Sequence, residues 1–238
     1  MTPSVADRYR AVVERVGRAC LRCGRNPEDV IVVAAGKTFG IEAIAAVISA
    51  GARDIGENYV QEARRKRQSV SAPAVRWHLI GTLQRNKAKE AVALFDLIHA
   101  LDTIELARAL DRAAEATAAT ARCLVEINLA EERGKGGVAP AALGELLTEL
   151  SGFSHLRIEG LTAIPPAAET PEASRHHFAR LRELLDEFGR LRLPNVQLKE
   201  LSMGMSADFE IAIEEGATLV RIGSAIFGPR AAKGERRE

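Results

Sequence analysis

One lysine stands where an apolar run delivers a long amine to the end of a predicted strand. Lys37 follows the run Val30-Ile-Val-Val-Ala-Ala-Gly36. A lysine amine in water has a pKa of about 10.4, so about one in two thousand is neutral at pH 7. Burial beside an apolar wall favours the neutral amine, which can attack a carbonyl carbon and form a Schiff base. On this segment alone, a lysine that extends from the strand into solvent is the simpler interpretation.

A second group of residues, near the C-terminal end of the chain, is suited to holding an anion. Gly204 and Gly223 let backbone N–H groups approach a ligand closely, and hydroxyls of Ser206 and Ser224 lie beside them. Ser206 precedes a predicted helix, whose N-terminus favours negative charge. For Ser206 taken alone, a simple helix N-cap with Asp208 in the first turn is an equally good explanation.

Arg221 lies in an apolar run and alternates with Val220 and Ile222. In a strand this alternation places it on the opposite face from its two neighbours. In a barrel, that face is the interior, where a guanidinium needs a partner. A ligand ring nitrogen or phosphate can supply one, and so can an internal ion pair with Glu57 or Glu200; the sequence leaves both open.

These residues need a scaffold, and eight strand-like runs supply one. Several of the runs are continuously apolar, as expected for parallel strands covered on both faces. The runs lie near Val30–Gly36, Arg53–Glu57, Val75–Gly81, Leu94–Leu101, Arg122–Leu129, Arg157–Ile164, Val196–Met203 and Thr218–Ser224.

Amphipathic stretches separate the runs, and a further helix, Val5–Cys23, precedes the first one. The stretches are Ile41–Ala50, Asn58–Ser69, Gln84–Ala91, Thr103–Ala116, Pro140–Leu150, Pro171–Gly189 and Ala207–Glu215. Strict alternation of eight strands with helices favours a (β/α)8 TIM barrel over an open doubly wound sheet. In such a barrel the functional site lies at the carboxyl ends of the strands, and phosphate is often held after strands seven and eight.

The 238 residues are expected to form one domain, with a core at about residues 5–230 and a charged, frayed tail at 231–238. The net charge of +1 gives no footprint for nucleic acid or an anionic membrane. No leader and no apolar run of about 18 residues is seen, so a cytoplasmic protein is expected. Cys20 and Cys23 are interpreted as thiols, because no second Cys/His pair follows at zinc spacing and no metal site is predicted.

Other polar residues follow the predicted strands with weaker signals. His78 lies within an apolar strand, where a lone histidine is more often a satisfied core residue than a catalyst. Gln84, Asn86 and Lys87 begin a helix and can meet a ligand or simply cap it. Lys135, in a glycine-rich loop, contacts anions or nothing.

Six blocks in their order along the chain resemble the pyridoxal phosphate homeostasis proteins. The likeness runs from about residue 5 to 230, and each block alone is modest. The blocks are Gly36-Lys37-Thr38, Ile55-Gly56-Glu57-Asn58-Tyr59-Val60-Gln61-Glu62, Trp77-His78-Leu79-Ile80-Gly81-Thr82-Leu83-Gln84-Arg85-Asn86-Lys87, Ile158-Glu159-Gly160-Leu161-Thr162-Ala163-Ile164-Pro165, Leu201-Ser202-Met203-Gly204-Met205-Ser206 and Val220-Arg221-Ile222-Gly223-Ser224-Ala225-Ile226-Phe227-Gly228.

The resemblance implies a barrel like the N-terminal domain of alanine racemase, with pyridoxal 5'-phosphate held as an aldimine on Lys37. It also implies that Asn58 approaches the ring, that Arg221 faces the pyridine nitrogen and that Met203 lines the cofactor wall. The phosphate is then surrounded by Ser202, Ser206, Gly223 and Ser224. The family often has Ser before the lysine and Pro shortly after Thr, where this chain has Gly36 and Phe39-Gly40.

An arginine at the ring nitrogen donates a hydrogen bond but does not keep the nitrogen protonated, so carbanions are stabilised poorly. By the resemblance, racemases of this barrel type add a tyrosine base from a further domain of the partner subunit. This sequence stops at residue 238, and its two tyrosines are Tyr9 and Tyr59. The leading hypothesis is therefore a monomeric protein, not an efficient enzyme, that stores, buffers or delivers pyridoxal phosphate, with apo-enzymes as recipients.

Two alternatives remain open at the level of sequence. One is a racemase-like pyridoxal phosphate enzyme acting on amino acids, in which Lys37 is also the base. The other is a Schiff-base aldolase on a phosphosugar, which is weaker because the sixth predicted strand has no lysine. A second cofactor position at Lys87 or Lys135 is a further hypothesis.

Overall fold

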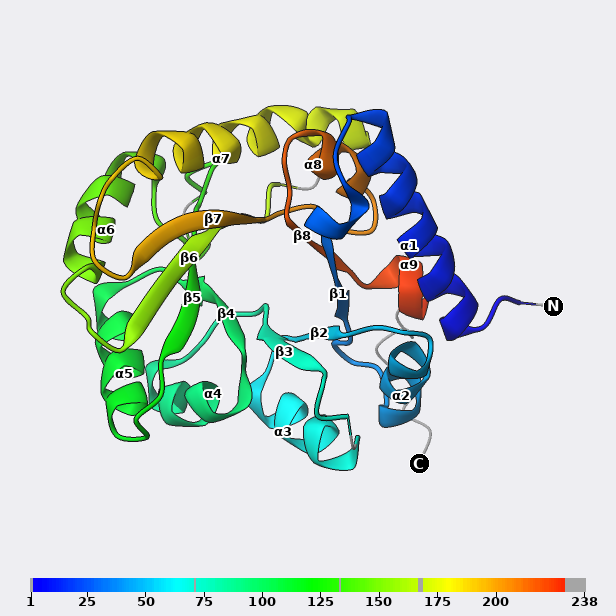
Figure 1. The fold of residues 1–238 in the computed structure, drawn as a ribbon, viewed down its shortest axis with the longest axis horizontal. Helices are drawn as coiled ribbons and strands as arrows, with labels where there is room; N and C mark the ends of the chain where they lie inside the picture. The colour runs from blue at the N-terminus through cyan, green and yellow to red at the C-terminus, as the bar shows by residue number, and fades with distance from the viewer. Residues whose placement is uncertain (1, 71, 133, 167–168, 230–238) are drawn as a thin grey trace.

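Eight parallel strands close into a barrel whose spatial order follows the chain (Figure 1). The computed structural model describes residues 2–70, 72–132, 134–166 and 169–229. β8 closes the barrel by pairing with β1, with Val32 opposite Val220. The strands are β1 Ile31–Ala35, β2 Asp54–Glu57, β3 Arg76–Leu79, β4 Leu97–Leu101, β5 Ala121–Glu126, β6 Leu156–Thr162, β7 Val196–Ser202 and β8 Leu219–Ile222. Each overlaps one predicted run, so the predicted (β/α)8 barrel is confirmed. The predicted frayed tail lies outside the described residues.

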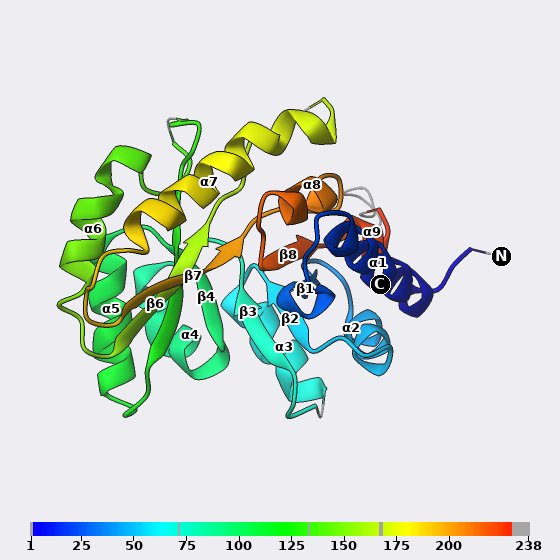
Figure 2. The ribbon, with the colours of Figure 1, turned by 45° about the horizontal axis from the view of Figure 1, so that its top comes forward.

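Helices surround the barrel and connect successive strands, close to the predicted stretches (Figures 1 and 2). The α-helices are α1 Val5–Arg22, α2 Ile41–Ser49, α3 Val60–Ser69, α4 Ala88–Leu94, α5 Ile104–Glu115, α6 Leu143–Leu150, α7 Arg175–Phe188, α8 Phe209–Glu214 and α9 Ser224–Phe227. Short 3-10 helices lie at Pro27–Asp29, Arg85–Lys87, Pro140–Ala142 and Pro171–Ser174.

The additional helix α1 has a well-defined start and one apolar face. The Ser4 hydroxyl accepts a hydrogen bond from the Asp7 amide (3.1 Å), and the Asp7 carboxylate accepts one from the Ser4 amide (3.2 Å). This capping box satisfies N–H groups that the first turn leaves without partners. Val12 and Val16 are buried one turn apart. Figure 2 shows α1 running beside α8 and α9, so it covers the side of the barrel where β8 closes the sheet.

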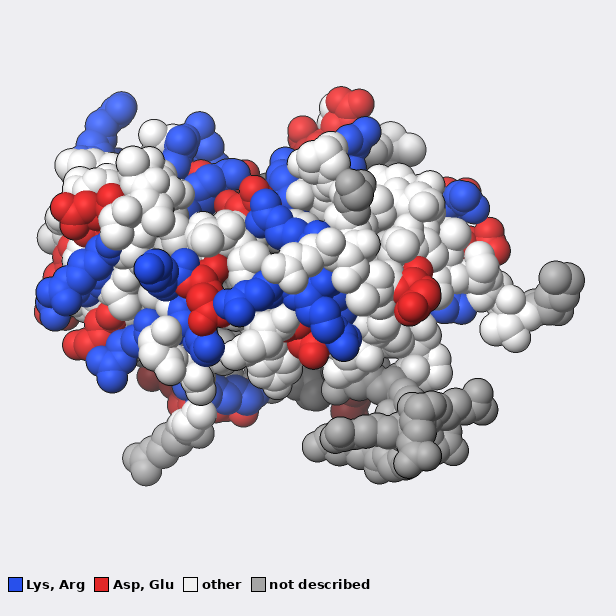
Figure 3. All heavy atoms as spheres, turned by 90° about the horizontal axis from the view of Figure 1, so that it is seen from below, with Lys and Arg blue, Asp and Glu red and all other residues white. Residues whose placement is uncertain are grey.

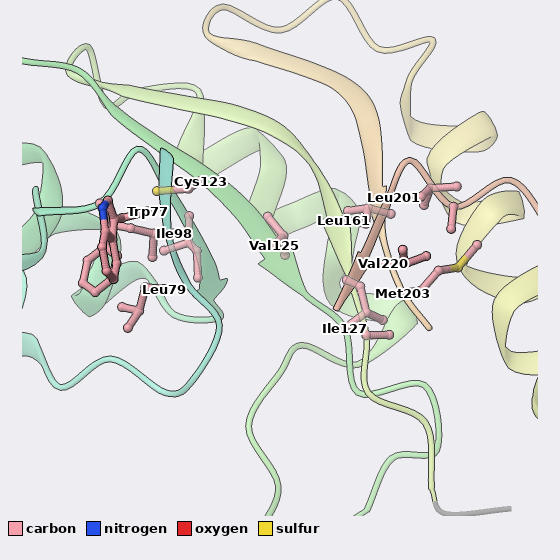
Figure 4. Close-up of a cluster of buried hydrophobic side chains, with 14 of the residues drawn as sticks. Trp77, Leu79, Ile98, Cys123, Val125, Ile127, Leu161, Leu201, Met203 and Val220 are labelled. Atoms are coloured by element: carbon pink, nitrogen blue, oxygen red, sulfur yellow. The ribbon is translucent and has the colours of Figure 1, made fainter. Parts of the chain in front are cut away.

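The core has two layers because side chains alternate between the two faces of each strand. Inside the barrel a small apolar cluster is formed by Val33, Leu97, Leu124 and Leu219. A much larger cluster lies between strands and helices. Figure 4 shows part of it, with Trp77, Leu79, Ile98, Cys123, Val125, Ile127, Leu161, Leu201, Met203 and Val220 labelled. Side chains on the inner face above the small cluster are therefore the ones that can reach a ligand.

The end of the last strand differs from the prediction. A strand over Thr218–Ser224 was predicted, whereas β8 ends at Ile222 and Ser224 begins α9. Gly223, at φ −108° and ψ −80°, leaves the extended conformation and directs the chain into this short helix. A four-residue helix is too short to produce a helical period in the sequence, so the pattern gave no sign of it.

Positive and negative side chains are interspersed on the face shown in Figure 3. This mixture agrees with the net charge of +1. Within the described ranges, no helix is long and apolar enough to cross a membrane. The three cysteines, Cys20, Cys23 and Cys123, are free thiols, as predicted for the first two.

Candidate functional site

A cavity of about 740 Å³ opens at the carboxyl ends of the strands, where a barrel is expected to carry its site. Its volume falls in the range of small-molecule sites. Six of the eight predicted site residues contribute to its wall: Lys37, Asn58, Ser206, Arg221, Gly223 and Ser224. The fold thus brings together Arg221 of β8 and residues from the segments that follow β1, β2, β7 and β8.

Lys37 lies directly after β1 and is half-buried in the cavity wall. The Gly36 carbonyl before it accepts a hydrogen bond from Lys66 Nζ of α3 (2.9 Å). Lys66 is fully buried and also pairs with Glu57 Oε1 at 2.7 Å. This buried pair fixes the backbone that presents Lys37.

Gly36 stands where the family often has Ser, and its surroundings explain the glycine. A Cβ at this position would lie 2.9 Å from Glu57 Oε1 and would also collide with the end of Ile44. Glu57 cannot withdraw easily because Lys66 holds it. The next residue but one, Thr38, has φ +69°, a left-handed conformation uncommon for a residue other than glycine. The turn after β1 is therefore tightly specified around Lys37.

Asn58 follows β2, lines the cavity and carries a buried side-chain oxygen. Its Oδ1 has no hydrogen-bond partner among the described residues, and the residue lines the cavity. Buried polar atoms in proteins are nearly always hydrogen-bonded. A ligand that brings a donor to this wall would satisfy the amide.

The loops after β7 and β8 meet through Ser206. Its Oγ accepts a hydrogen bond from the Ala225 amide in α9 (3.1 Å). The alternative role of Ser206 as the N-cap of the preceding helix is not what the structure shows, because α8 begins at Phe209 and Asp208 precedes it. Gly204 adopts φ +87°, which favours glycine. Ser206, Gly223 and Ser224 thereby lie in one part of the cavity wall, as an anion cradle requires.

Arg221 points into the barrel, as its alternation predicted, and is buried. It donates from Nη1 to Thr162 Oγ1 (2.9 Å), to the Ser202 carbonyl (2.7 Å) and to Ser202 Oγ, and from Nη2 to the Ala163 carbonyl (2.8 Å). Burial lowers the pKa of Arg221 to about 10, with Glu126 and Asp208 opposing that shift, so the guanidinium stays charged at pH 7.

The alternative partners considered for Arg221 are engaged elsewhere. Glu57 lies on the helix-facing side of β2 and pairs with Lys66. Glu200 Oε2 accepts a hydrogen bond from Thr218 Oγ1 at 2.6 Å. Strand alternation explains why Glu57 faces the helices, since Asp54 and Gly56 occupy the inner face of β2.

Two predicted site residues, Ser202 and Met203, are not among those that line the cavity. Ser202 is fully buried inside the barrel, where its carbonyl accepts a hydrogen bond from Arg221. Met203 packs with Leu201 and Val220 in the outer hydrophobic cluster (Figure 4). Because neighbouring residues of a strand face opposite ways, the position that brings Ser202 inward turns Met203 outward.

The cavity residues that sequence reasoning did not assign to the site include His99, Glu126 and Thr162. Burial raises the pKa of Glu126, and Asp102 raises it further, whereas Arg221 opposes this. His99 is buried, and burial lowers its pKa well below the usual value, helped by His78 and Arg221. The available signal was alternation, which places His99 on the inner face of β4.

The other polar residues considered from the sequence differ in whether they line the cavity. Lys87 and Gln84 line the cavity, and Lys87 Nζ binds Glu90 Oε1 at 3.0 Å. Lys135 is exposed, binds Glu132 Oε1 at 2.6 Å and is not among the cavity-lining residues. Tyr59 is on the cavity wall. In the part of the chain that the structure describes, no three His, Cys, Asp or Glu side chains gather to hold a metal ion.

The model of the alanine racemase N-terminal domain matches residues 9–231. The pyridoxal phosphate homeostasis protein of Aquifex aeolicus is 41% identical over 227 residues, which cover 95% of this chain and 99% of that protein. The protein of the same name from Escherichia coli K12 is 37% identical over 230 residues, covering 95% and 97%.

Solved structures give the same picture. PipY of Synechococcus elongatus with pyridoxal phosphate bound has a TM-score of 0.80 and 37% identity, covering 91% of this chain and 100% of its own. An alanine racemase of Clostridium difficile has a TM-score of 0.69 at 14% identity and covers 95% of this chain but 58% of its own. That second likeness concerns the fold alone.

Proposed function

Because this chain belongs to the alanine racemase N-terminal domain family, among its pyridoxal phosphate homeostasis proteins, we propose that it binds pyridoxal 5'-phosphate in the cavity and serves cofactor homeostasis. Lys37 supplies the amine that holds the cofactor covalently. The role is storage, buffering or delivery of the cofactor inside the cell, with apo-enzymes as recipients and the chain acting as a monomer.

The observation that carries this proposal is the joining of Lys37 with the anion cradle in one cavity. Ser206, Gly223 and Ser224 line the same cavity as Lys37 and Arg221. A phosphate on the cradle and an aldehyde at Lys37 are two ends of one small molecule. Asn58 Oδ1, which has no hydrogen-bond partner among the described residues, gives a further place for a ligand donor.

Ser202 and Met203 support this site from behind rather than touching its cavity. Ser202 holds Arg221 through its carbonyl, at 2.7 Å. Met203 fills the layer between sheet and helices beneath the same strand end. We therefore assign them supporting roles in cofactor binding.

The bound cofactor supplies an electron sink for carbanion chemistry, and the residues here are poorly arranged to exploit it. Arg221 stays protonated and donates, so it does not deliver a proton to a ring nitrogen. Tyr9 is buried in α1, and burial raises the pKa of its hydroxyl, with Asp54 adding to the shift. Tyr59, at 63% exposed, lies at the cavity rim. These features support binding without efficient turnover.

The experiment combines binding, delivery and turnover. Purified protein is titrated with pyridoxal phosphate, and its visible absorption is recorded. The loaded protein is then mixed with the apo-form of a pyridoxal phosphate enzyme, and recovery of that enzyme's activity is followed. We expect a bound chromophore, transfer of the cofactor, and slow or no exchange of α-hydrogens when amino acids are added in deuterated water.

Two results would change the proposal. A protein that stays colourless with added cofactor contradicts it. Rapid α-hydrogen exchange that is lost in Lys37→Ala favours the alternative, a racemase-like enzyme in which Lys37 is also the base.

A further inference from the structure

Five strands contribute to a line of buried polar side chains that runs through the barrel interior beneath the cavity. Asp54 Oδ1 contacts His78 Nε2 at 2.9 Å, and His78 Nδ1 contacts His99 Nε2 at 3.0 Å. His99 Nδ1 contacts Ser202 Oγ at 3.0 Å. Ser202 Oγ in turn accepts from Arg221 Nη1. We call Asp54, His78, His99 and Ser202 the interior relay.

The far end of the relay reaches the opposite mouth of the barrel. Arg76, about half exposed, donates from Nε and Nη2 to the two carboxylate oxygens of Asp54 at 2.7 and 2.8 Å. This bidentate pair holds Asp54 in its charged form, and hydrogen bonds from His78 and Arg76 keep the pKa of Asp54 low in spite of its burial.

With both imidazoles neutral, one arrangement of protons satisfies every member of the relay. A carboxylate can only accept, so His78 carries its proton on Nε2. His78 Nδ1 then accepts from His99 Nε2–H, and His99 Nδ1 accepts from the Ser202 hydroxyl. The Ser202 oxygen is left with lone pairs for Arg221. All hydrogen bonds therefore point one way, from Arg221 to Asp54.

The surroundings indicate that this line has a role beyond filling space. It shares the barrel interior with the apolar cluster of Val33, Leu97, Leu124 and Leu219. Burying two imidazoles and a hydroxyl is costly unless all are hydrogen-bonded, and apolar side chains fill such a space more cheaply. The line also ends on Arg221, which lines the cavity, and His99 itself lines the cavity.

The contacts of Arg221 show what the relay fixes. Nη1 is committed to Thr162 and Ser202, and Nη2 uses one hydrogen on the Ala163 carbonyl. A guanidinium carries five N–H donors. The contacts among described residues thus leave Nε–H and one Nη2–H for a ligand, and the Ser202 hydroxyl is one of the acceptors that fix where they point.

We propose that His78, His99 and Asp54 are positioning residues, which act through Ser202 to aim and tune the donor that Arg221 offers to the ring nitrogen of the bound cofactor. This inference rests on the proposed function. Removing a relay member lets the Ser202 hydroxyl rotate and weakens its polarisation, so Arg221 loses a fixed acceptor and part of its alignment.

The experiment measures binding of pyridoxal phosphate to the wild type, His99→Phe, Ser202→Ala and the double variant. Equilibrium dialysis gives the dissociation constant, and absorption spectra over pH give the titration of the bound chromophore. Leu124→Ala is the matched control, because it opens space in the same barrel interior and leaves every side chain of the relay in place. Thermal unfolding checks that each variant folds.

We expect His99→Phe and Ser202→Ala each to weaken binding by roughly tenfold, the scale of one charge-assisted hydrogen bond, and to shift the chromophore titration. The double variant should bind the cofactor no more weakly than the weaker-binding single variant, because both substitutions interrupt the same line of hydrogen bonds. His99→Asn, which keeps an acceptor for Ser202, should recover part of the loss. Leu124→Ala should stay within about twofold of the wild type.

The results that would contradict cofactor binding differ from those that would contradict the role of the relay. If the wild type binds no cofactor, the proposed function fails. If the wild type binds but His99→Phe binds equally well with an unchanged chromophore titration, the relay proposal alone is overturned. Equal shifts in Leu124→Ala, additive losses in the double variant, or nitrogen NMR showing mixed tautomers of His78 and His99 in the ligand-free protein would also overturn it. If His99→Phe does not fold, Ser202→Ala and the NMR measurement decide.

Discussion

Ionisable side chains of opposite charge, among them Lys37, Arg221 and Glu126, meet in the cavity wall. Lys37 and Arg221 carry amine and guanidinium groups, and Glu126 carries a carboxyl whose pKa is raised first by burial and then by Asp102. The basic groups attract an anionic ligand. The cavity therefore suits a phosphate with an aldehyde at its other end better than it suits a cation.

Much at this scale could be predicted, and the exceptions share one cause. Alternation placed Arg221 inside the barrel, and the end of an apolar run placed Lys37 at its mouth. The same alternation separates Ser202 from Met203 and turns His99 inward, but those assignments depend on the exact register of the strand. The partners of Arg221 depend on the closure of β7 against β8, which a sequence pattern does not specify.

His99 gives a prediction about the pH dependence of stability. Burial first, and then His78 and Arg221, lower its pKa in the folded state far below 6.5. His99 then binds a proton in the unfolded chain but not in the folded chain. Stability therefore falls as pH drops below the unfolded pKa of about 6.5. Between pH 7.5 and pH 5.5 this group should cost about 1.4 kcal/mol.

The measurement is urea unfolding of the wild type and His99→Phe across that pH range. We expect the wild type to lose stability relative to the variant by about this amount as pH falls. Parallel stability curves would show that His99 is not held neutral in the folded protein.

At the scale of elements, the turn after β1 depends on an ion pair between β2 and α3. Lys66 and Glu57 are fully buried, and Glu57 Oε2 has no partner within the described residues. Burial raises the pKa of Glu57, and Lys66 opposes the shift. Lys66→Met leaves an uncompensated carboxylate and should cost about 3–5 kcal/mol near pH 8.

Chemical denaturation at several pH values checks this. The loss should shrink toward pH 5, because protonation of Glu57 removes its charge, and Glu57→Gln with Lys66→Met should recover most of it. A single variant that costs nothing, or a double variant worse than the single one, would contradict this role for the pair.

The contact of β6 with β7 gives a second prediction for elements. Gly160 lies where the register between these strands shifts, and a Cβ there would overlap the Glu200 backbone. Backbone cannot withdraw as a flexible side chain can, so Gly160→Ala should destabilise by about 3 kcal/mol or more. Gly17→Ala, in the middle of α1 with open space around it, should instead stabilise by about 0.5–1 kcal/mol.

The urea unfolding midpoints of Gly160→Ala and Gly17→Ala, compared with that of the wild type, test these two predictions. If the two alanine variants have the same stability, the close approach at Gly160 is not a constraint on the barrel.

For the whole molecule, the closed barrel is what turns scattered residues into one site. Lys37 and Ser224 are 187 residues apart in the sequence, yet β1 pairs with β8 and brings them to one cavity. The number of strands and their order could be predicted, because apolar strand runs and amphipathic helical stretches succeed one another along the chain. The short α9 and the packing of α1 beside it leave no such pattern, since both depend on contacts made only after closure.

The most direct test of the central claim is borohydride reduction of the protein loaded with pyridoxal phosphate, followed by peptide mass mapping. Lys199→Ala is the matched control, because Lys199 is exposed and does not line the cavity. We predict that the reduced cofactor is found on Lys37 in the wild type and in Lys199→Ala, and is lost from the cavity in Lys37→Ala. A cofactor attached mainly to another lysine, or retained equally in Lys37→Ala, would contradict the account.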